Sequence, residues 1–237
     1  MHRTQGARVP THTRGGGQAR TRASLRAMYH RLFRVFGPQG WWPAQSPFEM
    51  MVGAILTQAT NWRNVERAIE GLQRADSLHP RSVLTMRGGD LERAIRSAGY
   101  FRQKAKRLKV FSRWYLGRFA GSPRRMFRTP WRALRQELLA LHGIGPETAD
   151  SMLLYAGAQP VFVVDAYTRR VFRRHRLISA RATYEEVQRF AMGQLPPRTS
   201  VYNEFHALLV AVGKRFCHRR NPACGHCPLG DLPHTVR

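Results

Sequence analysis

Apolar residues recur along most of this chain at the three- and four-residue spacing of an amphipathic helix. The segments Trp62–Leu72 and Ala105–Tyr115 show this period clearly. Only the short apolar run Val161–Val164 looks extended, and strand signals are otherwise scarce. The pattern therefore predicts an all-α fold.

Capping residues indicate where several of these helices begin. Ser46-Pro47-Phe48-Glu49 has the form of a capping box with proline at the first helical position, and it predicts a helix to about Gln58. Asn61 can cap the next helix, and Thr183 with Glu186 forms a second capping box. The other expected helices run from Asp90 to near Gly99, from Thr129-Pro130 into Leu141, and over about Val201–Phe216.

The stretch Leu141–Ala149, LHGIGPETA, has the composition of a tight hairpin that opens a helix. Gly143 and Gly145 allow sharp left-handed backbone turns, and Pro146 suits the first helical position. Amides exposed at that helix start point outward and can hold a phosphate.

The charge of the chain favours a polyanionic partner. Its 237 residues include 40 Lys and Arg against 14 Asp and Glu, for a formal net charge of +26. Each phosphate neutralised by such residues releases counterions, which favours binding to nucleic acid. The arginine surplus has a second explanation, the base composition of the genome. The charge is therefore most informative together with the hairpin.

The N-terminal segment does not have the pattern of a secretory signal. Residues 1–24 are basic, contain no acid and lack the apolar core of a secretory signal, so we expect a disordered tail. Either this tail adds DNA affinity or the true start is Met28. No apolar run approaches the roughly 20 residues that a membrane span needs. We therefore expect a cytoplasmic, nucleoid-associated protein.

Two further features suggest chemistry. Cys217, Cys224 and Cys227 are crowded near the C-terminus, which favours a metal site in a reducing compartment over a disulfide framework. Asp165 follows the apolar extended run and precedes a new helix, where an aspartate is a good N-cap. A carboxylate fixed there, beside a phosphate-holding hairpin, also suits chemistry on DNA that needs no metal.

These motifs together resemble the helix-hairpin-helix DNA glycosylases of the endonuclease III superfamily. The shared pattern is L-x-G-[IV]-G-x-x-[TS]-A followed by V-D roughly twenty residues later, with LTQAT upstream and the cysteines at the end. The similarity runs from about Leu25 to Cys227. It implies a six-helix lobe over residues 40–159, with the hairpin motif at 141–157. Residues 25–39 and 160–237 would form a second lobe, with DNA in the cleft between the two.

The resemblance implies that Asp165 is catalytic. Breaking an N-glycosidic bond builds positive charge on the deoxyribose, and a nearby carboxylate stabilises that charge and orients the attacking water. Family members that also cut the DNA strand carry a lysine at the position of Glu147, and a carboxylate cannot form the imine that this lysine forms. We therefore expect hydrolysis that leaves an abasic site. Lys214 is the other amine to consider, although its position fits a DNA or structural contact better.

The base pocket is expected to contain Trp41, Trp42 and Trp62. The sequence GWWP and its spacing to LTQ resemble the 3-methyladenine glycosylase branch, in which aromatic residues at these positions line the pocket. Electron-rich rings stack on electron-poor alkylated purines and attract their positive charge. The structural alternative is that the tryptophans belong to the core, since Trp62 begins an apolar stripe.

The resemblance also assigns contacts outside the pocket. Gln58 would fill the gap left by a flipped base, and Gly143, Gly145 and Arg169 would contact the DNA backbone. The carbonyl groups expected to bind a monovalent cation are those of Leu139, Leu141 and Ile144.

The C-terminal loop, residues 217–233, departs from the family pattern. Cys217-x6-Cys224-x2-Cys227 copies three ligands of the family's [4Fe–4S] loop, but proline stands at position 233, where the fourth cysteine is expected. A four-iron cluster requires four protein ligands. The remaining options are completion by His234, His226 or His218, a zinc ion, or a loop held without metal by the packing of Phe216 and Leu229.

The leading hypothesis is a monomeric, monofunctional glycosylase that removes alkylated bases of the 3-methyladenine type from double-stranded DNA. A downstream abasic-site endonuclease would continue the repair. One alternative keeps the mechanism and changes the substrate to uracil or mismatched thymine, which needs hydrogen-bonding groups in the pocket. The other is a non-catalytic DNA-binding protein. Such a protein does not need Asp165, because a carboxylate that faces the anionic DNA backbone would only repel it.

Overall fold

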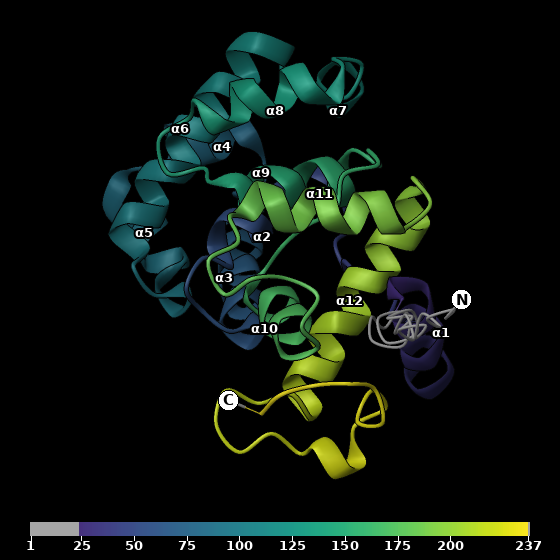
Figure 1. Ribbon diagram of the computed structural model, residues 1–237. Helices are drawn as coiled ribbons and strands as arrows, with labels where there is room; N and C mark the ends of the chain where they lie inside the picture. Colours follow the sequence, from purple (N-terminus) through teal and green to yellow (C-terminus); the bar gives the residue numbers. More distant parts are fainter. Residues whose placement is uncertain (1–23, 237) are drawn as a thin grey trace, which may run out of the picture.

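The computed structural model describes residues 24–236, and the helices account for most of this range (Figure 1). The expected disordered tail, residues 1–24, lies outside the described part except for Ser24. Within the described range there is no β-strand, and no helix is long and apolar enough to cross a membrane. The helical segments are α1 (Leu25–Phe36), α2 (Pro47–Leu56), α3 (Trp62–Arg74), α4 (Pro80–Thr85), α5 (Gly88–Ala94), η1 (Arg96–Ala98), α6 (Phe101–Phe119), α7 (Pro123–Met126), α8 (Trp131–Leu139), α9 (Pro146–Ser151), η2 (Met152–Ala156), α10 (Ala166–Arg174), α11 (Tyr184–Gln194), α12 (Thr199–Arg215) and η3 (Cys224–His226).

The predicted caps form the helix starts. The hydroxyl of Ser46 accepts a hydrogen bond from the Glu49 amide at 3.1 Å, and the Asn61 side chain caps α3 in the same way. At α11 both halves of the capping box form between Thr183 and Glu186. Local sequence therefore determines where these helices begin.

Two local predictions need correction. The helix expected to start at Asp90 begins two residues earlier, at Gly88, and it breaks into α5 and the 3-10 turn η1 before Gly99. Gly143 has the expected positive φ of +82°, but Gly145 is extended, with φ −93° and ψ 175°. Gly145 precedes Pro146, and the proline ring restricts the residue before it to the extended region. The run Val161–Val164 is buried and, within the described range, is not part of a β-strand.

The helices form the two lobes of the expected all-α architecture. In Figure 1, α4, α6, α7 and α8 lie at one end of the molecule and the C-terminal loop lies at the other. The first helix, α1, packs against α12 and α11, so both ends of the described chain contribute to one lobe. Helices α2 to α9 fall within residues 40–159, which remains our proposed boundary for the other lobe.

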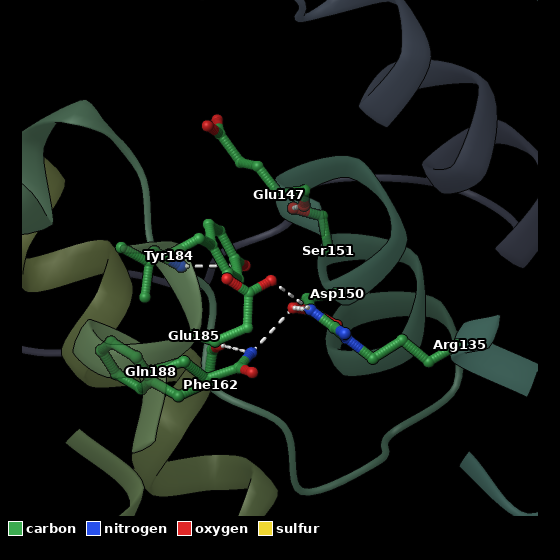
Figure 2. A network of polar contacts seen from close by, with 9 residues as sticks. Arg135, Glu147, Asp150, Ser151, Phe162, Tyr184, Glu185 and Gln188 are labelled. Carbon is green, nitrogen blue, oxygen red and sulfur yellow. Dashed lines mark hydrogen bonds and ion pairs between the residues drawn. The ribbon is translucent and has the colours of Figure 1, made fainter. Parts of the chain in front are cut away.

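A buried polar network joins the hairpin helix α9 to the segment that leads to Asp165 (Figure 2). Asp150 on α9 is fully buried, and it accepts two hydrogen bonds from Arg135 on α8, at 2.7 and 3.1 Å. The amide of Gln188 on α11 donates to Asp150 at 2.7 Å and to the carbonyl of Phe162 at 2.6 Å. The network therefore fixes the extended run relative to three helices.

Candidate active site

One pocket of about 530 Å³ brings together the residue predicted to be catalytic and those predicted to form the base pocket. It lies where the loop between α2 and α3, the start of α9, the segment before α10 and one face of α12 meet. The predicted residues that line it are Trp41, Trp42, Gln58, Trp62, Glu147, Asp165 and Lys214. Gly143, Gly145 and Arg169 lie outside this lining. The lining combines aromatic rings with polar and charged side chains, which are the kinds of group that bind and orient a ligand in a concave site.

Asp165 is the N-cap of α10, as its sequence position suggested. Its Oδ1 atom accepts a hydrogen bond from the Thr168 amide at 2.7 Å, and its side chain is largely buried. The buried run before it, Val161–Val164, anchors the backbone in the core. Because one carboxylate oxygen is held by the helix start, the other remains available to the pocket.

The three tryptophans pack on one another at the pocket wall. Their ring centroids are 4.8 to 5.0 Å apart, and Trp42 meets Trp62 edge-on, with 88° between the ring planes. All three are partly buried. A planar base between two rings needs about 3.5 Å on each side. The centroid separations therefore leave no gap between two of these rings that is wide enough for a planar base.

Glu147 lies in the first turn of α9 and lines the pocket together with Asp165. Figure 2 shows its side chain pointing away from the network around Asp150. Glu147 is exposed to solvent as a residue. Desolvation of its carboxyl group by the pocket walls and then the charge of Asp165 nevertheless raise its pKa to about 7, against the opposing effect of Arg169. The exposed first-turn glutamate expected from the sequence is therefore also a pocket residue. Lys214 reaches the same pocket from α12.

Gln58 is bonded to the hairpin. Its amide nitrogen donates to the carbonyl of Gly143 at 2.9 Å and to the Thr148 hydroxyl at 3.0 Å, while Arg107 donates to its carbonyl. A side chain at Gly143 would collide with Arg107, which is a second reason for glycine there. The sequence did not indicate these partners, because they come from α6 and α9, far along the chain.

Arg169 lies beside the pocket in a groove of about 400 Å³ that four other arginines also line. Its guanidinium donates to the carbonyl of Ala182 at 2.7 Å. Others in this groove also bond to backbone carbonyls: Arg170 to those of Cys217 and Gly213, and Arg174 to those of His218 and Arg219. The groove is strongly basic, as a phosphate-binding surface requires.

The three cysteines line one small cavity together with His234. Arg174 donates to Sγ of Cys217 at 3.1 Å, a type of contact that stabilises a thiolate or a cluster sulfur. In the described part of the chain, no three side chains of the metal-binding types gather around a single ion position. Three thiols and one imidazole around a shared cavity do provide the donor types that an iron–sulfur cluster uses.

Two residues escaped the sequence analysis: His206, which lines the pocket, and its hydrogen-bond partner Tyr155, which does not. Tyr155 lies in the π-helical segment η2, and its hydroxyl is hydrogen-bonded to Nδ1 of His206. The Nε2 atom of His206 lies 3.6 Å from Oδ2 of Asp165. Each residue stands alone in an apolar helical stretch, where a buried polar residue with a structural partner is the ordinary interpretation.

Comparison with known proteins agrees with this geometry. Residues 52–197 match the model of HhH-GPD superfamily base excision DNA repair proteins, and residues 217–232 match the iron–sulfur binding domain of endonuclease III. A Methanocaldococcus jannaschii protein, provisionally named a DNA repair glycosylase, is 43% identical over 207 residues, which cover 86% of this chain and 93% of that protein.

Solved structures show the same architecture. The H. pylori 3-methyladenine DNA glycosylase bound to 1,N6-ethenoadenine aligns with a TM-score of 0.72 and 27% identity, covering 81% of this chain and 98% of that one. A non-covalent endonuclease III–DNA complex aligns with a TM-score of 0.76 and 23% identity, covering 88% and 93%, which shows a shared fold. This chain therefore belongs to the HhH-GPD superfamily of base excision DNA repair proteins, as a helix-hairpin-helix glycosylase of the endonuclease III type.

Proposed function

We propose that this protein is a monofunctional DNA glycosylase that removes alkylated purines of the 3-methyladenine type. The observation that carries the proposal is the shared pocket of Asp165 and the three tryptophans. A flipped nucleotide in this pocket would place its base on an aromatic face and its sugar near the carboxylate. The similarity to the H. pylori enzyme, named for 3-methyladenine, supports the same substrate class.

In the proposed reaction, the N-glycosidic bond breaks and its electron pair leaves with the base. Positive charge develops on the deoxyribose, and the Asp165 carboxylate stabilises it. A water oxygen then bonds to the sugar carbon, and its proton passes to Asp165 or to solvent. An alkylated purine that carries positive charge leaves without protonation, so one carboxylate is sufficient.

Aromatic stacking would select the base. The faces of Trp41, Trp42 and Trp62 attract a cationic purine more strongly than a neutral pyrimidine. Uracil or mismatched thymine would instead need directed hydrogen-bond donors and acceptors at the base edge. The tryptophan-rich wall therefore favours alkylated purines over those substrates.

Hydrolysis without strand cleavage follows from Glu147, which cannot form an imine. Lys214 is the amine to test, because it lines the same pocket. Borohydride reduction during turnover should trap no covalent protein–DNA adduct. An adduct that is lost in Lys214→Ala would instead assign lyase chemistry to this lysine.

DNA would contact the hairpin beside the pocket, through the amides near Gly143 and Gly145. Arg169 and its groove would take a backbone phosphate, and Gln58 would enter the duplex after exchanging its bonds to Gly143 and Thr148. A monovalent cation at the carbonyls of Leu139, Leu141 and Ile144 would stabilise the hairpin. We expect a monomer that passes its abasic product to an endonuclease.

We also propose that the C-terminal loop holds an iron–sulfur cluster through Cys217, Cys224 and Cys227. His234 is the further donor in the same cavity. Such a cluster would order the loop, and it is not needed for the base-excision chemistry at Asp165. Visible absorption together with iron and sulfide analysis of the purified protein would test this assignment.

The substrate test is incubation of the protein with methylated duplex DNA, followed by chromatography of the free bases. The proposal predicts released 3-methyladenine, with strand breaks that appear only after alkali treatment. Duplexes with uracil or a thymine mismatch serve as competing substrates. Tight DNA binding without release of any base would instead support the non-catalytic alternative.

A further inference from the structure

A histidine lies between a phenol and the carboxylate of Asp165 in the wall of the pocket. His206 on α12 is only 6% exposed. Its Nδ1 atom is bonded to the Tyr155 hydroxyl, and its Nε2 atom lies 3.6 Å from Oδ2 of Asp165. Within the described residues, Nε2 is a buried polar atom without a hydrogen-bond partner. Such an atom is unusual in a folded protein and calls for an explanation.

Tyr155 connects this histidine to the base pocket. It belongs to η2, the π-helical continuation of α9, and π-helical turns are frequent at functional sites. Its ring packs against Trp42, with centroids 5.5 Å apart. The same phenol therefore contacts an aromatic residue of the pocket and the imidazole that faces Asp165.

Only one arrangement of hydrogens satisfies both ends of the imidazole. Burial lowers the pKa of His206, with Asp165 opposing, so the ring is neutral near pH 7 and carries one N–H. The Asp165 carboxylate can only accept, so that hydrogen belongs on Nε2. Nδ1 is then the acceptor for the Tyr155 hydroxyl. Burial raises the pKa of Tyr155 well above its usual value, which keeps the phenol protonated as the donor.

We propose that His206, held as the Nε2–H tautomer by Tyr155, is the positioning residue for the Asp165 carboxylate; the inference deepens the function proposed above. The Thr168 amide holds Oδ1, and the Nε2–H group approaches Oδ2. Once the Nε2–H group reaches hydrogen-bond distance, the two donors fix the plane of the carboxylate toward the sugar and the attacking water. The distance of 3.6 Å exceeds a hydrogen bond and is expected to shorten when DNA fills the pocket.

A neutral donor suits this task better than a cation. The transition state requires negative charge on Asp165 to balance the positive sugar. A protonated imidazole at the same position would compete for that charge, whereas a neutral Nε2–H group orients the carboxylate and leaves its charge intact. His206 therefore acts through Asp165 and does not itself take part in bond breaking.

Three variants test the proposal by single-turnover base release from methylated duplex DNA. His206→Phe keeps a ring and removes both nitrogens, and it should lower the rate by about 100-fold, the size expected for a misplaced catalytic group. His206→Gln places an amide N–H near the position of Nε2 and should recover most of that loss. Tyr155→Phe keeps the histidine and should give an intermediate loss. His30→Gln, at an exposed position of α1, is the matched control and should leave the rate unchanged.

Two further measurements separate positioning from a structural role. Affinity for a duplex with a non-hydrolysable abasic-site analogue should stay within about twofold in all variants, since the binding surface is intact. Nitrogen-15 NMR of histidine-labelled protein should show His206 as the neutral Nε2–H tautomer, and Tyr155→Phe should disturb that state. The NMR measurement does not depend on activity, so it tests the tautomer even if the wild type releases no alkylated base and the proposed function fails.

An Nδ1–H tautomer in the wild type would overturn the proposal. So would full base-release activity in His206→Phe, or a His206→Gln variant that is as slow as His206→Phe while its melting temperature and DNA affinity match the wild type. In each case His206 would be a packing residue only.

Discussion

The short helix α10 has the pocket around Asp165 at its N-terminal end and the cysteine loop at its C-terminal end, and these two regions are built differently. At the N-terminal end, Asp165 enters a pocket assembled from distant segments of the chain. At the C-terminal end, Arg174 and His175 bond to the loop that carries the cysteines and to Pro233 within it. The pocket has all the groups that its proposed chemistry requires, whereas the loop lacks one cysteine of the family pattern.

The pocket that contains Asp165 and the cavity lined by the cysteines have no lining residue in common. The aromatic pocket depends on long-range packing, which the buried Asp150 network supports. The loop is held mainly by arginine contacts to backbone carbonyls and to a sulfur. We therefore expect substitutions at the two ends to have separable effects.

The largest expected effect is the loss of the network that supports the pocket. Asp150→Ala leaves the Arg135 guanidinium, which is mostly buried, without its carboxylate, and breaking such a pair costs about 3–5 kcal/mol of unfolding free energy. Urea unfolding would measure this loss. Asp90→Ala, which removes an exposed pair with Arg87, is the matched control and should change the unfolding curve little. Equal curves for the two variants would contradict a supporting role for Asp150.

The next effect concerns base stacking. Trp62→Ala should weaken productive binding of a methylated duplex by about 1–3 kcal/mol, the value of one base–aromatic contact. In single-turnover rates measured over a range of enzyme concentrations, the weaker binding would appear as a higher enzyme concentration at half-saturation. Trp131→Ala removes a tryptophan of α8 that does not line the pocket, and it should leave half-saturation unchanged. If both variants shift equally, Trp62 has no special role in the pocket.

Changes in the cysteine loop should affect metal content and leave the chemistry at Asp165 intact. Cys227→Ser should abolish the visible absorption and iron content expected of the wild type. The single-turnover rate should persist at saturating enzyme. A wild-type protein without iron would contradict the cluster proposal, and a variant with full iron but no base release would contradict the separation of the two regions.

The smallest effect concerns the pH dependence of stability through Glu147. Its pKa in the folded protein is about 7, raised from the ordinary 4.5 by desolvation and Asp165. The folded state therefore binds the proton more tightly, and this stabilisation, complete below pH 4.5, is lost as the pH rises through 7. Glu147→Gln should remove that decline, so its stability relative to the wild type increases between about pH 5 and pH 8. A pH-independent difference in urea unfolding would indicate an ordinary solvated glutamate.

Local sequence patterns predicted much of the fold and part of the site. Ser46, Asn61, Thr183 and Asp165 all cap the helices that they were expected to begin, because N-cap bonds join residues three positions apart. Gly145 was misjudged because the constraint from Pro146 outweighs the freedom of glycine. The sequence therefore predicted an interaction correctly where both partners lie within a few residues of each other.

Long-range partners could not be predicted in this way. Tyr155 and His206 are 51 residues apart, and nothing around either one indicates that the two meet beside Asp165. Gln58 is similar, because its bonds to Gly143 and Thr148 arise only when the hairpin folds against the loop after α2. These contacts arise from tertiary packing. The spacing of polar residues within one helix does not predict which distant residues they will contact.

The most direct test of the account compares the wild type with Asp165→Asn in single-turnover release of 3-methyladenine from methylated duplex DNA. Asparagine retains the cap of α10, so the variant should stay folded and bind DNA normally. We predict that the wild type releases the base and that the rate in the variant falls about 10²–10³-fold, the usual loss when a group that stabilises transition-state charge is removed. Equal rates in the two proteins would contradict the assignment of base excision to this carboxylate.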